Sequence, residues 1–232
     1  MQKPIIGIVG KAEPPLEEDF WHRITEADEF RYLTVKHGGV ALMLLPTEAT
    51  LTFNDSDIRD DTVLTAEELQ DLYRQMDFCD GFILQGGLCS SQYEIEIARR
   101  ALAQDKPLLG ICAGFNNILR ALGSDVELDE TRRHDRYDRA YRHPVRLLEG
   151  TVMRALAGTD RLQVNSIHSM VAPPALVEPF ATVSALSEDG LVESFELPDK
   201  RFVLGVKWHP ELLLGEDYVD RLFAAFVDRC RP

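Results

Sequence analysis

The sequence predicts an α/β fold built on a mostly parallel sheet. Short apolar runs alternate with segments whose apolar residues recur at helical spacing, which is the pattern of successive βαβ units. The length of 232 residues favours one large domain, residues 1–232, over two small ones. A composition that is 45% hydrophobic is sufficient for a sizeable core.

The first half of the chain carries four expected strands, and segments of helical period lie between them. The strands are residues 5–9, 40–45, 81–84 and 108–111. Two helices are expected where apolar residues follow a helical period, within residues 20–37 and 93–103. A third helix is expected from the capping box Thr65-Ala66-Glu67-Glu68, and it should continue through Met76.

The second half begins with a polar, arginine-rich segment, residues 126–142. Mixed charge of this kind favours a solvated loop or a flap, with a substrate-facing role as the alternative. The arginines are Arg132, Arg133, Arg136, Arg139 and Arg142. Strand-like pieces and a closing amphipathic helix are expected beyond it, at residues 145–148, 162–167, 181–185, 191–197, 202–206 and 218–230.

Charge and composition exclude several classes of function. The formal net charge of −14 argues against binding to nucleic acid or to anionic membranes. Attraction of a cationic substrate is the alternative to a simple role in solubility. No apolar run approaches the ~20 residues of a membrane span, and residues 1–10 are too short and glycine-punctuated for a signal peptide.

The cysteines point to a reducing compartment. They form neither a CxxC pair nor a metal-ligand spacing, so reduced thiols and a cytoplasmic location are expected. The four residues are Cys79, Cys89, Cys112 and Cys230.

The turn Gly110-Ile111-Cys112-Ala113-Gly114 joins an expected strand to the apolar stretch 115–122. A strand, a tight turn and a helix around a cysteine form the cysteine version of a nucleophile elbow. The helix N-terminus favours a thiolate there, and the flanking glycines permit the sharp turn. An inert core thiol is the alternative.

A cysteine nucleophile needs a base, and His209 is the best candidate among the histidines. The segment Trp208-His209-Pro210-Glu211 closes the apolar run 202–206 and therefore lies at a strand's carboxyl end. In an extended segment Glu211 shares a face with His209. It can then accept from one ring nitrogen while the other faces Cys112. A surface imidazole is the alternative.

Donors for an oxyanion are expected at the same edge of the sheet. The backbone N–H of Ala113 follows the nucleophile and opens a helix. Gly86-Gly87 closes the strand 81–84 and supplies the second candidate. Carboxyl ends of parallel strands meet at one edge, which brings this turn towards Cys112. A simple turn is the alternative reading of the glycines.

Three of these motifs, in their order along the chain, resemble the class I glutamine amidotransferase superfamily. They are Gln85-Gly86-Gly87, the turn around Cys112, and residues 205–211. Two others, Asn165-Ser166-Ile167-His168-Ser169 and Glu188-Asp189-Gly190 with Glu193, resemble its γ-glutamyl hydrolase branch, and most closely the γ-glutamyl-γ-aminobutyrate hydrolases. The resemblance implies one flavodoxin-like domain whose doubly wound sheet has helices on both faces.

The resemblance also implies a Cys112–His209–Glu211 triad that hydrolyses γ-glutamyl amides. Cys112 would attack the γ-carbonyl, the N–H groups of Ala113 and Gly87 would hold the oxyanion, and a γ-glutamyl thioester would form. Neither a metal nor an organic cofactor is expected, and the partner is a small γ-glutamyl molecule. The residues placed near the glutamyl group are Gly86, Asn116, Asn165, Ser166 and His168.

Several positions depart from the family pattern and bear on the substrate. Asn116 stands where a glutamine is common, Ala113 where an arginine is frequent, and Lys207 where a glutamine is frequent. The loop 88–92 after Gly87 is short. A glutaminase subunit that passes ammonia to a separate synthetase and a non-catalytic binding or redox relative are the alternatives. The leaving amine and the oligomeric state, including a homodimer, stay open.

Overall fold

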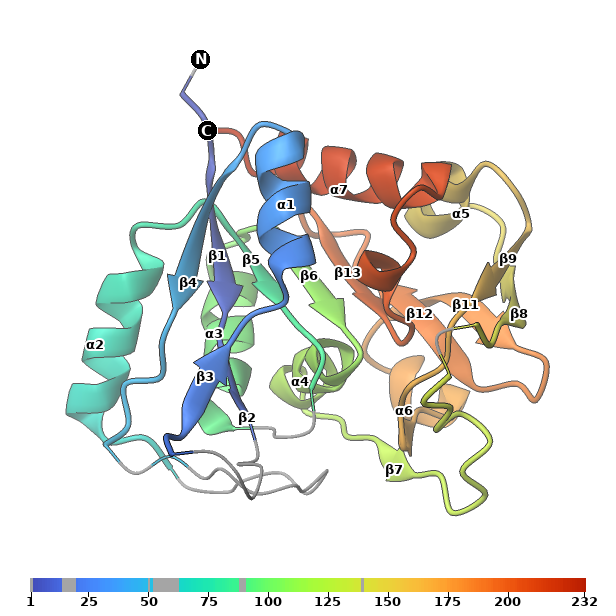
Figure 1. Cartoon of the computed structure of the whole chain (residues 1–232), viewed down its shortest axis with the longest axis horizontal. Coiled ribbons are helices and arrows are strands. Elements are labelled where there is room, and N and C mark those ends of the chain that lie inside the picture. The colour runs from blue at the N-terminus through green and yellow to red at the C-terminus, as the bar shows by residue number, and fades with distance from the viewer. Residues whose placement is uncertain (1, 14–19, 50, 52–62, 88–90, 139) are drawn as a thin grey trace.

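A nine-stranded sheet crosses the molecule in the computed structural model, which describes residues 2–13, 20–49, 51, 63–87, 91–138 and 140–232. The strand order is β4-β1-β5-β6-β13-β12-β11-β8-β9 (Figure 1). The first five of these strands are parallel. They are β4 (Val40–Leu44), β1 (Ile5–Val9), β5 (Gly81–Leu84), β6 (Leu108–Ile111) and β13 (Val203–Val206).

Four antiparallel strands extend the sheet beyond β13. All four overlap the strand-like pieces expected from the sequence. They are β12 (Val192–Glu196), β11 (Thr182–Ser187), β8 (His143–Leu147) and β9 (Arg161–Val164). The strand order thus joins residues from both halves of the chain at its centre, where β6 lies beside β13.

Helices cover both faces of the sheet, which confirms the doubly wound α/β fold. One hydrophobic cluster lies under α1 (Asp28–Lys36), α5 (Val152–Ala157) and α7 (Asp217–Arg229). The other lies under the remaining α-helices of the described residues, which are α2 (Ala66–Met76), α3 (Gln92–Ala103), α4 (Ala113–Ala121) and α6 (Pro174–Val177). None of the described helices has the length and apolar character needed to cross a bilayer.

The helix expected within residues 20–37 begins only at Asp28, so the first part of that prediction is wrong. Residues Arg23–Thr25 instead form β3, which pairs with β2 (Lys11–Glu13). The buried amide of Gln85 fixes this course, because its Nε2 donates to the carbonyls of Val9 (2.8 Å) and Thr25 (2.9 Å). A second two-stranded ribbon pairs β7 (Glu127–Leu128) with β10 (Met170–Val171).

The capping box at the start of α2 is present as predicted. Thr65 Oγ1 accepts from the Glu68 N–H at 3.3 Å, and a Glu68 carboxylate oxygen accepts from the Thr65 N–H at 2.7 Å. These two hydrogen bonds satisfy N–H groups that a helix terminus otherwise leaves unpaired. The helix therefore starts where the sequence indicates.

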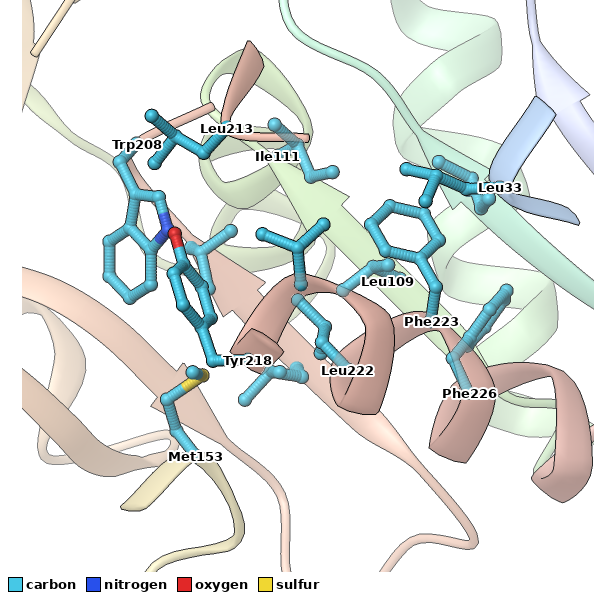
Figure 2. Close-up of a cluster of buried hydrophobic side chains, with 14 of the residues drawn as sticks. Leu33, Leu109, Ile111, Met153, Trp208, Leu213, Tyr218, Leu222, Phe223 and Phe226 are labelled. Atoms are coloured by element: carbon cyan, nitrogen blue, oxygen red, sulfur yellow. The ribbon is translucent and has the colours of Figure 1, made fainter. Parts of the chain in front are cut away.

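Helix α7 holds the strands that carry the candidate site. Its side chains Leu222, Phe223 and Phe226 are buried against Leu109 and Ile111 of β6 (Figure 2). Each such side chain contributes about 1.5–3 kcal/mol on burial. The alternation of side chains along a strand sends Leu109 and Ile111 to this cluster. The last residue before Cys112 is thus fixed by the core.

Gly114 is the point where α4 comes closest to β5. A Cβ atom there would overlap the carbonyl oxygen of Leu84 and lie 2.7 Å from its carbonyl carbon. We expect Gly114→Ala to lower the free energy of unfolding by about 3 kcal/mol, because backbone must move to admit the methyl group. Denaturant unfolding measures this loss.

Gly150→Ala is the matched control for that substitution. Gly150, unlike Gly114, has a positive φ (80°), and no heavy atom lies within 4 Å of the added Cβ. Its cost is the left-handed backbone alone, about 1 kcal/mol. Equal losses in the two variants would contradict the close packing of α4 on β5.

Candidate active site

Three neighbouring strand ends form the candidate site. Gly86 and Gly87 follow β5, Cys112 follows β6, and His209 lies shortly after β13. The strands β5, β6 and β13 are adjacent and parallel. The expectation that these motifs share one edge of the sheet is therefore confirmed.

Cys112 has the strained backbone of a nucleophile elbow. Its φ and ψ are 54° and −103°, between the end of β6 and the start of α4. A positive φ in a residue other than glycine is uncommon and costs about 1–3 kcal/mol. Gly110 and Gly114 make the turn feasible, because a Cβ on Gly110 would lie 2.7 Å from the Gly114 carbonyl oxygen. Cys112 as a whole is 8% exposed.

His209 and Glu211 form a close pair, in which Glu211 is buried and His209 is partly buried. The Nδ1–H of His209 donates to Glu211 Oε1 at 2.6 Å, and Glu211 is 4% exposed. The sequence suggested that this pair lies on an extended segment, and that prediction is wrong. Residues Pro210–Leu212 form the 3₁₀ helix η1, because proline suits the first position of a helix. This turn brings the carboxylate back to the ring.

Asn165 fixes the backbone of His209. Its Oδ1 accepts from the His209 N–H at 2.8 Å, and its Nδ2 donates to the His209 carbonyl at 2.8 Å. Asn165 is 2% exposed. The family resemblance implied a place for Asn165 near the glutamyl group, but its side-chain oxygen and nitrogen both hydrogen-bond to the backbone of His209. Asn165 therefore holds the backbone of His209 in place.

Charge and hydrogen bonding favour a thiolate–imidazolium pair. Burial alone would raise the pKa of the Cys112 thiol, but the charge and hydrogen bond of His209, with the charge of Lys207, lower it overall. Burial alone would lower the pKa of His209, but the charges of Glu211 and Cys112 raise it well above its usual value. Such a pair is the reactive state of a cysteine nucleophile.

Gly86 allows Cys112 and His209 to meet. A Cβ atom on Gly86 would lie 2.5 Å from His209 Cε1 and 3.2 Å from Cys112 Cβ. Gly87 has a φ of 145°, and a Cβ there would lie 2.8 Å from Cε of the buried Lys11. Both positions require glycine for close approach. The oxyanion role of Gly87 and Ala113 stays a prediction.

A cavity of about 390 Å³ opens above Cys112. Gly87, Ala113 and His209 line it together with the thiol, so the two predicted oxyanion donors face one space. This volume lies in the range of small-molecule sites. Of the residues expected near a substrate, Asn116 and His168 line the cavity, whereas Gly86, Asn165 and Ser166 are not among its lining residues.

The arginine-rich segment contributes to the same cavity. Arg132, Asp135 and Tyr137 line it, which favours the substrate-facing role over a loop that is solvated throughout. Arg139 lies outside the described residues, as do Cys89 and residues 88–90 of the short loop after Gly87.

Two buried ionisable side chains near the site were missed as site residues from the sequence. Lys207 is fully buried, and its Nζ donates to Asn116 Oδ1 at 2.8 Å. Glu193 is 1% exposed, and burial raises its pKa to about 8 although the charge of Lys207 lowers it. The sequence feature that could have pointed to Lys207 is its position directly after the apolar run 202–206. Lys207 therefore fixes Asn116 and adds positive charge near the thiol.

Residues 90–211 match the Peptidase C26 family, and this region is more than half of the chain. The chain belongs to the Peptidase C26 family. This membership confirms the resemblance to class I glutamine amidotransferases. The matched region contains the elbow at Cys112 and ends at Glu211, so the predicted nucleophile, base and acid all lie inside it.

Several curated proteins are similar to this Peptidase C26 member. NtpR of Enterococcus hirae is 32% identical over 156 residues, covering 62% of this chain and 64% of NtpR. The γ-glutamyl-γ-aminobutyrate hydrolase PuuD of Escherichia coli is 33% identical over 149 residues, covering 58% of each chain. A CTP synthase of Chlamydia trachomatis is 28% identical over 194 residues, covering 70% of this chain and 36% of the synthase. The matches span less than two thirds of each relative.

Solved structures show the same fold. The glutaminase domain of Trypanosoma brucei CTPS superposes with a TM-score of 0.63 at 16% identity, over 96% of this chain and 93% of that domain. A glutamine amidotransferase from Thermotoga maritima has a TM-score of 0.55 at 16% identity, over 91% of this chain and 77% of the other. These similarities confirm the flavodoxin-like architecture.

The thiols of this Peptidase C26 member differ in environment, which allows a test. Burial raises the pKa of Cys79 to about 11 and also raises that of Cys230, whereas the pKa of Cys112 is lowered. We expect iodoacetamide at neutral pH to alkylate Cys112 at least about tenfold faster than these two, because the thiolate is the reacting species. Peptide mapping measures the three rates, and equal rates would contradict the ion pair.

Proposed function

We propose that this chain is a cysteine-dependent hydrolase of γ-glutamyl amide bonds. The observation that carries the proposal is Cys112 on a strained elbow, with His209 hydrogen-bonded to the buried Glu211 at 2.6 Å. This arrangement has the three parts of a nucleophile, a base and an orienting acid. The proposal treats residues 1–232 as one catalytic domain.

The first half of the reaction forms a thioester. The Cys112 thiolate attacks the γ-carbonyl carbon, and the carbonyl oxygen becomes an oxyanion held by the N–H groups of Ala113 and Gly87. Each such donor is worth about 10²–10³ in rate. The intermediate collapses as the C–N bond breaks, and the imidazolium of His209 gives its proton to the leaving amine.

The second half hydrolyses the thioester. Neutral His209 now accepts a proton from water, whose oxygen attacks the γ-glutamyl carbonyl. The C–S bond breaks, glutamate leaves, and the thiolate–imidazolium pair is restored. Throughout both steps Glu211 keeps the ring oriented and stabilises its positive charge.

The cavity offers complementary groups for the rest of a glutamyl substrate. Arg132 suits the α-carboxylate, since a guanidinium can bind a carboxylate with two hydrogen bonds. Asp135 suits the α-ammonium. Both residues line the cavity with Cys112, and Arg132 Nη1 lies 4.0 Å from Asp135 Oδ2. This pair of opposite charges supports an amino-acid head group rather than a simple amide.

A glutaminase that supplies ammonia to a separate synthetase is the second candidate. The similarity to CTP synthase over 70% of this chain favours it. The similarity to PuuD favours the hydrolase, since that protein is a γ-glutamyl-γ-aminobutyrate hydrolase. The two candidates share the triad and differ in the leaving group, which is an amine in one case and ammonia in the other.

Hydrolysis of a defined panel separates the candidates. The purified protein is incubated with γ-glutamyl-γ-aminobutyrate, a γ-glutamyl polyamine, the α-linked glutamyl isomers and glutamine, and released glutamate is measured. We expect release from γ-linked amines and none from the α-linked isomers. Hydrolysis of glutamine alone would replace the proposal with the glutaminase, and no release from any compound would overturn both.

A further inference from the structure

A second cluster of titratable side chains lies next to the catalytic cavity. His134 comes from the arginine-rich segment, His143 from the start of β8, and Glu193 from β12. One ligand-type atom from each lies within 4.8 Å of the others. The cluster borders the cavity through His168, whose Nε2 is 3.8 Å from Glu193 Oε1. The proposed hydrolysis uses none of these three side chains.

The ring of His134 is oriented by a carboxylate. Its Nε2–H donates to Asp189 Oδ2 at 3.1 Å, which leaves Nδ1 facing Glu193 Oε1 at 3.5 Å. The hydroxyl of Ser166, 3.4 Å from Nδ1, donates its proton to the His134 carbonyl at 2.8 Å. The Ser166 proton is therefore not directed at Nδ1. A carboxylate on the outer nitrogen is the usual support of a metal-binding histidine.

The other two side chains carry buried atoms without partners. Among the described residues, Nε2 of His143 and Oε2 of Glu193 are buried and make no hydrogen bond. Glu193 is 1% exposed. A neutral imidazole binds metals through a ring nitrogen that makes no other hydrogen bond. Leaving such polar atoms unpaired costs about 1–3 kcal/mol each.

We propose that His134, His143 and Glu193 bind one divalent transition-metal ion of the Zn²⁺ class. Two imidazoles and one carboxylate are a ligand set that suits Zn²⁺, with a water molecule in the fourth position. Tetrahedral coordination at metal–ligand distances near 2.0–2.1 Å separates ligand atoms by about 3.3 Å. The 3.5 Å between His134 Nδ1 and Glu193 Oε1 already fits this separation.

The site has its own route from solvent. A surface pocket of about 340 Å³ is lined by His134, His143 and Asp189, and it shares none of its lining residues with the catalytic cavity. Glu188 adds negative charge to this pocket, whereas Arg133 and Arg136 oppose a cation there. Lys207 opposes it from the interior, through its charge near Glu193. The carboxylate of Asp189 offsets these charges, and Glu193, whose pKa burial raises to about 8, adds its negative charge once the ion displaces its proton.

A bound ion would connect two parts of the fold that surround the cavity. His134 lies in the segment that carries Arg132, Asp135 and Tyr137, whereas Glu193 lies in the central sheet. The metal would hold this rim segment against the sheet. Because a ligand that binds only the folded protein raises its stability, Zn²⁺ should also raise the melting temperature.

Zn²⁺ binding to the Cys112→Ala protein tests the proposal. This background removes the thiolate, which could itself bind Zn²⁺ together with His209. Calorimetric titration with zinc chloride should show one equivalent bound. His143→Gln and Glu193→Gln, each in the same background, should weaken binding by at least about 100-fold, and Asp189→Asn by about 10-fold. His37→Gln is the matched control. His37 contacts Asp220 and lines neither the catalytic cavity nor the pocket at the cluster.

The outcomes are decisive in both directions. Stoichiometric binding that is lost in His143→Gln and kept in His37→Gln supports the site. No binding to Cys112→Ala, or equal affinity in Cys112→Ala with and without His143→Gln, overturns it. His143 is half-buried, and circular dichroism of each variant verifies its fold. The result is independent of the proposed hydrolysis, because the tested protein lacks the nucleophile.

Discussion

Replacing Cys112 by alanine is expected to abolish the hydrolysis of γ-glutamyl amides. The thiolate forms the covalent bond to the substrate, so its removal leaves only the oxyanion donors and substrate binding. In enzymes of this kind, loss of the nucleophile lowers kcat by about 10⁶-fold. Glutamate release at saturating substrate measures the effect.

Cys79→Ala is the control for the loss of a thiol. Cys79 is 2% exposed and packs in the hydrophobic cluster under α2 and α3, away from the cavity. We expect this variant to keep its kcat. If Cys112→Ala retained more than about one hundredth of the activity, catalysis by this thiol would be refuted.

Replacing Glu211 by glutamine is expected to lower kcat by about 10³–10⁴-fold, with a much smaller change in KM. The carboxylate raises the pKa of His209. Without its charge the ring loses its proton at lower pH, so the alkaline limb of kcat/KM should move to lower pH. The pH profile of the variant, compared with the unmodified protein, measures both effects.

Glu196→Gln controls for the loss of a buried carboxylate. Glu196 accepts hydrogen bonds from the backbone N–H groups of Val152 (2.9 Å) and Met153 (3.3 Å), at the start of α5. Its replacement should leave the pH profile unchanged. Full kcat and an unshifted alkaline limb in Glu211→Gln would show that the 2.6 Å hydrogen bond to His209 has no role in catalysis.

The parts of the molecule that the sequence predicted correctly depend on local patterns. Strand β6, the turn at Cys112 and helix α4 form one continuous segment, and its apolar and glycine residues encode the elbow directly. The grouping of Gly87, Cys112 and His209 at one edge of the sheet follows from the general rule that sites form at the carboxyl ends of parallel strands, whereas the pairing of β6 with β13 is seen only in the fold. The helical spacing of Phe20 and Ile24 wrongly predicted a helix there. Ile24 instead lies in β3, which Gln85 holds from the end of β5 through the carbonyl of Thr25.

The functions of individual side chains around the site depend on contacts between distant segments. Asn165 and His209 are 44 positions apart, and only the fold shows that the amide holds the histidine. Lys207 meets Asn116 across 91 positions. His134, His143 and Glu193 have no recognisable metal-binding spacing, and the family resemblance implied no metal. The fold reveals this cluster, because it wholly or partly buries the three side chains and brings their ligand-type atoms together. A single sequence does not encode either property locally.

The covalent intermediate provides the most direct test of the proposed mechanism. The protein is mixed with γ-glutamyl-γ-aminobutyrate and quenched in acid within one turnover, and peptides are analysed by mass spectrometry. We expect a γ-glutamyl adduct on the peptide that contains Cys112 and no such adduct in Cys112→Ala. Hydroxylamine should remove the adduct, because it cleaves thioesters. Release of glutamate without any adduct on Cys112, or an adduct on another residue, would contradict it.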